Sequence, residues 1–151
     1  MSSDKNRTKW IHSINEGLIA FNENYSNKFI VINQENGNLP SNDVRCVAVD
    51  NRNQLWIGTF TGLRIINSID RFITETELTS TNIVIQEGDL AQELFYQQVI
   101  QDIKVDGSNN KWVAIADAGV FQVSPNGQTT IRRFTKENSP LPSNTINDID
   151  I

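Results

Sequence analysis

Three tryptophans divide the chain into similar units, and this spacing constrains the fold more than any other feature. Each tryptophan is followed by a β-branched residue and, six or seven positions later, by a glycine, and each is preceded at six positions by an aspartate. The residues in these positions are Trp10, Trp56 and Trp112, then Gly17, Gly62 and Gly119, and Asp4, Asp50 and Asp106. A unit that recurs at such a period is typical of repeat proteins, in which neighbouring units bury one another's apolar faces.

Each unit is predicted to be an antiparallel meander of four strands. The period-2 segments Val44–Val49 and Ile100–Val105 lead to the second and third aspartates and predict inner strands. The aspartate can cap a tight turn by accepting backbone N–H groups, and the tryptophan strand follows. The glycine before the third strand supplies a positive φ. Fourth strands are expected at Lys28–Ile32, Ile83–Gln86 and Ile131–Phe134.

The pattern predicts an all-β chain that forms a β-propeller segment of three four-stranded blades. Blade 1 spans about residues 4–36 and lacks its inner strand, because Asp4 would end that strand. Blade 2 spans about 42–88 and blade 3 about 98–136. Residues 145–151 then form an unpaired inner strand, which is expected to complete blade 1 by strand closure. A helical turn is conceivable only at Leu90–Tyr96, which disfavours an α/β fold.

The same residues resemble the two-component regulator propeller repeat. This resemblance lies in the loop Leu39-Pro40-Ser41-Asn42, the aspartate six residues before Trp56, and Gly62-Leu63. Residues 83 to 144 are similar to the PorZ-like propeller proteins of the Bacteroidetes type IX secretion system. That similarity implies a parent protein in the periplasm or at the cell surface, which supports attachment of cargo to anionic lipopolysaccharide. Resemblance to hybrid two-component regulators implies the alternative, an oligosaccharide-sensing propeller.

Composition excludes several other classes of protein. Lys and Arg number 13 against 18 Asp and Glu, so the net charge of −5 argues against duplex nucleic acid as a partner. No apolar run approaches the roughly 20 residues that a membrane-spanning helix needs. The residues after Met1 lack the apolar core of a signal peptide. Cys46 is the only cysteine, so no internal disulfide can form.

No residue pattern predicts an active site, a cofactor or a metal centre. Cys46 has no histidine or aspartate in a recognisable nucleophile context. A calcium loop starting at Asp106 would need glycine and glutamate where Lys111 and Asp117 stand. His12 has no second ligand at metal spacing, so a structural role is favoured. The chain is therefore predicted not to be an enzyme.

Any ligand is expected at one rim of the central channel, where the inner strands begin and the turns between second and third strands converge. Amide-rich, partly charged rims suit saccharides or peptides, although a solvated rim without a ligand is the other interpretation. The tryptophans are instead expected to be core, because repetition is what packing requires. The rim candidates are Asn42, Asp43, Arg45, Gln98, Gln101, Asn144 and Asn147, with Gln97 beside them and Asn15, Glu16, Thr61 and Asp117 in the turns.

Three blades are fewer than the roughly four to eight of a closed ring. We therefore expect self-assembly by intermolecular strand closure, as a dimer with six blades or a trimer with nine; a piece of a larger propeller is the competing account. The tryptophan spacings of 46 and 56 residues, with the offset of 102 from Pro40 to Pro142, make the chain nearly a whole number of blades. A chain that holds nearly a whole number of blades favours an excised fragment or an engineered part over a natural boundary.

Overall fold

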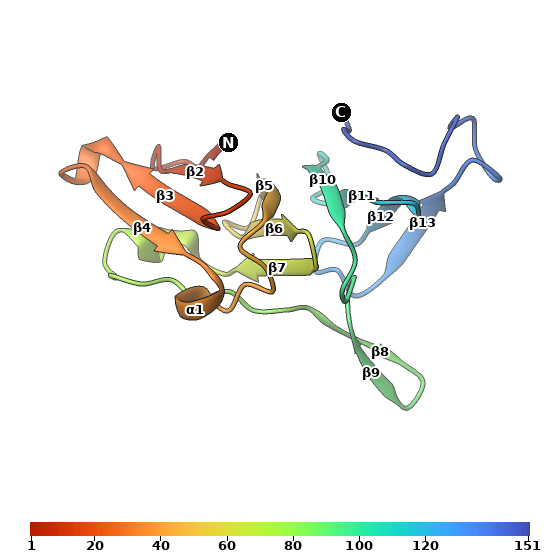
Figure 1. Ribbon diagram of the computed structural model, residues 1–151, viewed down its shortest axis with the longest axis horizontal. Helices are drawn as coiled ribbons and strands as arrows, with labels where there is room; N and C mark the ends of the chain where they lie inside the picture. Colours follow the sequence, from red (N-terminus) through yellow and green to blue (C-terminus); the bar gives the residue numbers. More distant parts are fainter.

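Three antiparallel sheets follow one another along the chain in the computed structural model, which describes residues 1–151 (Figure 1). The first sheet contains β1 (Ser2–Ser3), β2 (Lys9–His12), β3 (Leu18–Asn22) and β4 (Lys28–Ile32) in that order. The second contains β5 (Val44–Val49), β6 (Leu55–Thr59) and β7 (Gly62–Ile66). The third contains β10 (Ile100–Val105), β11 (Lys111–Ile115), β12 (Gly119–Val123) and β13 (Thr130–Phe134). The predicted all-β class is confirmed.

The remaining elements are short. A separate hairpin of β8 (Val84–Glu87) and β9 (Leu90–Glu93) projects from the sheets (Figure 1). Single 3-10 turns lie at Glu23–Tyr25 and Ile69–Phe72, and one helical turn, α1, spans Gln34–Gly37. The three sheets correspond to the three predicted blades, and both chain ends lie on the side of β5 and β10 (Figure 1).

Blade 2 differs from the expected four strands. Its sheet ends at β7, and the only further pairing is an isolated bridge between Ile65 and Thr81. Ser80 fixes this crossing point, because its N–H and its hydroxyl both donate to the carbonyl oxygen of Gly37 at 2.8 and 2.7 Å. The predicted fourth strand, Ile83–Gln86, therefore leaves the sheet and pairs with β9. Within the range where a helical turn was conceivable, Leu90–Glu93 form β9, and the residues after Glu93 form a turn that is not helical.

The inner strand of blade 1 also differs from the prediction. Ser2 and Ser3 pair with Trp10 and Lys9, so a two-residue inner strand is present before Asp4. At the other end, residues 145–151 form no strand and take part in no β-sheet of the same chain. The predicted closure of blade 1 therefore does not occur within one chain.

Two apolar clusters fill the spaces between adjacent blades. One lies between blades 1 and 2 and includes Trp10 and Phe72, whose rings meet edge to face at 6.3 Å. The other lies between blades 2 and 3 and includes Trp56 and Phe95. Trp10 and Trp56 are fully buried, whereas Trp112 is half-buried because no blade covers its side of blade 3. Each tryptophan thus faces the position of the following blade.

The repeated aspartate joins the first turn of each blade to its tryptophan. In every blade one carboxylate oxygen accepts two backbone N–H groups of the turn, at 2.9 to 3.0 Å. The other oxygen accepts the indole N–H of Trp10 at 3.2 Å in blade 1 and of Trp112 at 3.0 Å in blade 3. The spacing of six residues therefore fixes the tryptophan against its own turn.

The glycines before the third strands are required by the backbone. Gly17 and Gly119 have φ of +84° and +85°, and a Cβ atom at either would overlap a carbonyl oxygen of the neighbouring strand. Gly62 also has a positive φ, of +144°. Because L side chains rarely adopt these conformations, glycine is the residue that permits the turn.

Candidate functional site

A buried ion pair joins blades 2 and 3. The ammonium of Lys111 lies 2.8 Å from a carboxylate oxygen of Asp50, and neither side chain is exposed to solvent. The same ammonium donates to the carbonyl of Pro125 at 2.8 Å and stands 4.7 Å above the ring of Trp56. Since Lys111 occupies this oxygen of Asp50, the indole N–H of Trp56 has no hydrogen-bond partner, unlike that of Trp10.

The charges of this pair depend on each other. Burial alone would raise the pKa of Asp50, but hydrogen bonds from Lys111 and from the turn N–H groups of Gln54 and Arg52 bring that pKa below its ordinary value. Burial lowers the pKa of Lys111, and Asp50 opposes this effect. The interface between blades 2 and 3 therefore consists of apolar side chains around one charged pair.

The face of blade 3 that points away from blade 2 resembles the interface between blades 2 and 3, but no other blade covers it. An apolar cavity of about 700 Å³ lies there, between the blade and the C-terminal segment. Trp112 and Phe134 stack in it with ring centroids 5.6 Å apart. The segment is held by Asp102, which accepts the N–H of Ile149 at 2.8 Å. The apolar lining comprises Trp112, Val120, Phe134, Leu141, Ile146, Ile149 and Ile151.

The opposite open face belongs to blade 1. Register places two rows of side chains on the side away from Trp10: Lys9, Phe21 and Phe29 in one row, and Ile11, Ile19 and Val31 in the other. Phe29 is 66% exposed, and Lys9 forms no ion pair. A sheet that is apolar on both faces is normally covered on both, so this face resembles half of a blade interface.

Asp43 and Arg45, the rim candidates at the start of β5, form an ion pair with each other. Arg45 donates two hydrogen bonds to the carboxylate of Asp43, at 2.8 and 2.9 Å, and this contact raises the pKa of Arg45. Its guanidinium lies 5.1 Å from the ring centroid of Phe60, which is 46% exposed. The structure thus places an aromatic side chain, which the sequence reasoning did not select, beside two predicted rim residues.

Asn42 and Asn144 occupy equivalent positions and hold the loops between blades. Their side-chain oxygens accept the backbone N–H groups of Gln34 and Lys136, both at 2.8 Å. Their carbonyl oxygens accept the N–H groups of Gly17 and Gly119, both at 2.9 Å. These contacts give both asparagines a structural role at the rim.

The other rim candidates form few side-chain hydrogen bonds within the chain. Gln98 and Asn147 are exposed and Gln101 is half-buried, and their side chains form no hydrogen bond within the chain. Asp117, in a turn, accepts the hydroxyl of Thr145 at 2.8 Å. The rim prediction stays a prediction for these positions, which lie on blade 3 and the C-terminal segment.

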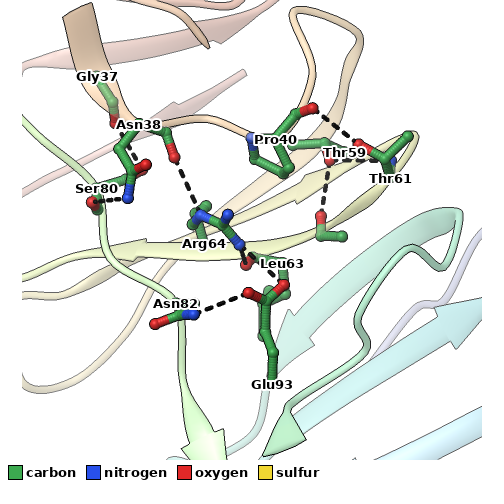
Figure 2. A network of polar contacts seen from close by, with 11 residues as sticks. Gly37, Asn38, Pro40, Thr59, Thr61, Leu63, Arg64, Ser80, Asn82 and Glu93 are labelled. Atoms are coloured by element: carbon green, nitrogen blue, oxygen red, sulfur yellow. Dashed lines mark hydrogen bonds and ion pairs between the residues drawn. The ribbon is translucent and has the colours of Figure 1, made fainter.

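A polar pocket on blade 2 brings together residues that the sequence reasoning largely missed. Figure 2 shows Arg64 at its centre, donating to the carbonyl of Asn38 at 3.0 Å and to Glu93 at 3.1 Å. Asn82 donates to the other oxygen of Glu93 at 2.8 Å, which orients the carboxylate. A cavity of about 320 Å³ adjoins this pair and is lined by Pro40, Thr61, Arg64, Glu93, Tyr96 and Gln97.

Tyr96 and Glu93 line both this pocket and a second one. Tyr96 is 60% exposed, and the second cavity, of about 350 Å³, is also lined by Ala91 and Gln92. The neighbours of Tyr96, Phe95 and Gln97, both have positive φ, at 57° and 56°, a conformation that is costly for side chains of this size. A sequence signal existed: the spacing from Trp56 to Trp112 is 56 residues instead of 46, and the added residues include the β8–β9 hairpin.

The side chains of Cys46 and His12 lie in surroundings that favour a structural role over a reactive one. Burial, the largest cause, raises the pKa of the Cys46 thiol to about 12, so the thiolate is scarce at neutral pH. Burial also lowers the pKa of His12, as does the positive N-terminus. No group of three or more His, Cys, Asp and Glu side chains could hold a metal ion. None of the helical segments has the length and apolar character to cross a membrane.

Comparison with known proteins identifies the architecture. Residues 38–61 match the two component regulator propeller family. The chain is similar to PorZ, described as an essential bacterial surface component of the type-IX secretion system of Porphyromonas gingivalis, with a TM-score of 0.85 and 23% identity over 98% of this chain and 22% of PorZ. No curated protein sequence matches the chain.

Two extracellular domains from B. thetaiotaomicron, described as belonging to hybrid two component systems, are also similar. The BT4673 domain gives a TM-score of 0.70 and 19% identity, covering 99% of this chain and 20% of that domain. The BT3049 domain gives 0.64 and 23%, covering 95% of this chain and 17% of that domain. The chain thus spans about a fifth of the length of these proteins. Their shared architecture confirms that the three sheets are blades of a β-propeller.

Proposed function

We propose that this chain is a non-enzymatic interaction scaffold whose three blades assemble with a second copy into a ring of twice as many blades, outside the cytoplasm. The open faces of blades 1 and 3 carry the proposal, because each has the apolar composition of an internal blade interface. Covering them would bury Phe29 and the cavity around Trp112, whose apolar side chains otherwise face water. The surface and extracellular descriptions of the structural relatives support the location.

Light scattering coupled to size-exclusion chromatography tests the assembly. At micromolar concentration we expect a mass of twice the 17.1 kDa of one chain. Phe29→Glu should convert the dimer to monomer, because it places a charge in the covered face. Leu90→Glu is the matched control, since Leu90 is 64% exposed but lies on the β8–β9 hairpin. A folded wild-type monomer would refute the assembly.

Saccharide binding is a second candidate function, and the pocket beside Tyr96 favours it. An exposed aromatic ring that lines two cavities can stack on a sugar, while Arg64, Glu93 and Gln97 offer donors and acceptors to its hydroxyl groups. The Arg45 and Phe60 pair at the rim provides a further position of the same kind. The anionic lipopolysaccharide implied by the sequence resemblance would compete with Asp43 and Glu93 for these two arginines.

Calorimetric titration with oligosaccharides and purified lipopolysaccharide tests this candidate. Tyr96→Ala is expected to weaken binding by roughly tenfold or more without changing the fold, because the ring is mostly exposed and supplies about 1.4 kcal/mol of stacking. Tyr25→Ala, on blade 1, should bind as the wild type does. Arg45→Ala separates the rim from the pocket. If no saccharide binds the wild type, the scaffold function stands alone.

A further inference from the structure

The β8–β9 hairpin projects away from the blades and forms a sheet of only two strands (Figure 1). Leu94 donates its N–H to the carbonyl of Ile83 at 2.8 Å and so closes the base of the hairpin. Hydrogen-bonded and non-hydrogen-bonded pairs alternate along antiparallel strands. The backbone groups of Gln86 and Ala91, which are directly opposite each other three pairs further along, therefore point outward from the two edges of the hairpin.

The two edges differ in what lies beside them. At the β8 edge, the side-chain amide of Gln128, from blade 3, donates to the carbonyl of Val84 at 3.0 Å. At the β9 edge, no turn or loop hydrogen bond of the backbone involves Ala91. The cavity of about 350 Å³ lies against this same edge, because Ala91 and Tyr96 both line it. The β9 edge therefore combines available backbone groups with space beside them.

The β9 edge lacks the features that normally prevent strand pairing. Exposed sheet edges are usually protected by lysine, proline or a bulge. Residues 83–99 contain no lysine, arginine or proline, and the register between β8 and β9 has no bulge. Leu90 and Tyr96 are 64% and 60% exposed and offer apolar contacts. The edge is therefore receptive to an added strand.

The base of the hairpin holds this edge in place. Ile83, Leu94 and Phe95 are buried in the core between blades 2 and 3. The carboxylate of Glu93 accepts a hydrogen bond from Arg64 at 3.1 Å, which ties the end of β9 to β7 (Figure 2). A surface that is already ordered loses little conformational entropy on binding. An added strand would thus retain most of the free energy of its contacts.

The charge of the hairpin indicates which kind of strand fits. Glu87 and Asp89 lie at the tip, where both are exposed and neither forms an ion pair. The third acidic residue, Glu93, is paired with Arg64. A complementary strand carries basic residues at the end beside the tip and an apolar or aromatic residue at the end beside Tyr96.

We propose that the β9 edge binds an extended, basic peptide segment of a partner protein by strand addition. The added strand exchanges backbone hydrogen bonds with Ala91 and places a side chain in the cavity beside Tyr96. The inference rests on the scaffold function proposed above and names a partner surface for it, but it does not require assembly with a second copy. Saccharide binding at the same cavities is the competing use.

Fluorescence anisotropy with labelled synthetic peptides tests the choice of partner. One probe alternates valine and threonine, with lysines at one end and a tyrosine at the other, and a second probe has glutamates in place of the lysines. We expect the lysine probe to bind the wild-type chain at least roughly tenfold more tightly. The double variant Glu87→Lys and Asp89→Lys should reverse this preference. Equal binding of both probes would contradict a basic partner.

Proline substitutions test the backbone pairing. Ala91→Pro removes an N–H that points outward and leaves the hairpin's own hydrogen bonds in place, so the lysine probe should bind roughly tenfold more weakly or worse. Gln86→Pro is the matched control, because Gln86 lies directly opposite on the β8 edge, and it should bind as the wild type does. In NMR spectra of the unmodified chain, the amide of Ala91 should shift when the lysine probe is added.

The outcomes separate this inference from the other proposals. Equal affinity of Ala91→Pro and the wild type, with no shift of the Ala91 amide, overturns strand addition. Oligosaccharide binding without any peptide binding at millimolar concentration assigns the cavities to saccharides and also overturns it. A wild-type monomer that binds the lysine probe overturns the assembly and supports strand addition.

Discussion

Lys111→Ala is expected to lower the free energy of unfolding by about 3–5 kcal/mol, one of the largest effects of any single substitution in this chain. The variant leaves the carboxylate of Asp50 buried between two blades without its cation. It also removes the ammonium above the ring of Trp56 and leaves the carbonyl of Pro125 unpaired. Urea denaturation followed by tryptophan fluorescence measures the change.

Lys9→Ala is the matched control, because Lys9 precedes its tryptophan as Lys111 does but has no ion-pair partner in one chain. At a concentration where the chain is monomeric, it should change stability by less than about 0.5 kcal/mol. Lys111→Met with Asp50→Asn should recover much of the loss, since replacing a buried pair by groups without net charge is often neutral. A cost below about 1 kcal/mol for Lys111→Ala would contradict the buried-pair interpretation.

The same pair gives stability a defined dependence on pH. The pKa of Asp50 in the folded chain lies below its ordinary value, so the carboxylate binds fewer protons folded than unfolded. The contribution of the Asp50 carboxylate to the free energy of unfolding is therefore complete above the pKa of the unfolded chain, about 4. It is lost as the pH falls through the lower pKa of the folded chain. The Asp50→Asn variant should lack this part of the acid-dependent loss, which denaturation at a series of pH values measures.

Trp10→Ala is expected to cost about 3–5 kcal/mol, because it opens a large cavity in the core between blades 1 and 2. The ring is fully buried, contacts Phe72 and donates its N–H to Asp4. The loss should appear both as a lower urea midpoint and as a lower melting temperature.

Trp112→Ala provides the comparison, since Trp112 has the same place in its blade but is half-buried. In the monomer it should cost less than half as much as Trp10→Ala, because the cavity it leaves is already open to solvent. In a dimer that covers blade 3, its cost should rise toward that of Trp10→Ala. Equal costs in the monomer would show that the face of blade 3 is not an open interface.

Most of the fold could be predicted because its determinants are local. The alternation of Val44–Val49 and the aspartate six residues before Trp56 specify a strand and a capped turn within a few residues. Repetition of the unit then made the propeller recognisable. The departures at blade 2 had no such basis, because the hydrogen bonds from Ser80 to Gly37 join residues that are distant in sequence.

The candidate site was less predictable for the same reason. Asp43 and Arg45 lie two residues apart on one strand, so their proximity could be anticipated. Arg64 and Glu93 are separated by 29 residues and come together only because the β8–β9 hairpin returns to β7. Tyr96 became a candidate because it is exposed and lines two cavities, which no sequence pattern reports.

The sequence by itself determined the repeat, the strand periodicity and the turns, because these depend on residues within one unit. Only the tertiary structure decided which faces are covered. It buried Lys111 against Asp50 from another blade, left the equivalent Lys9 without a partner, and exposed one side of Trp112. The physical reason is that burial and ion pairing arise between blades, so identical positions in the repeat acquire different energies according to which neighbour stands beside them.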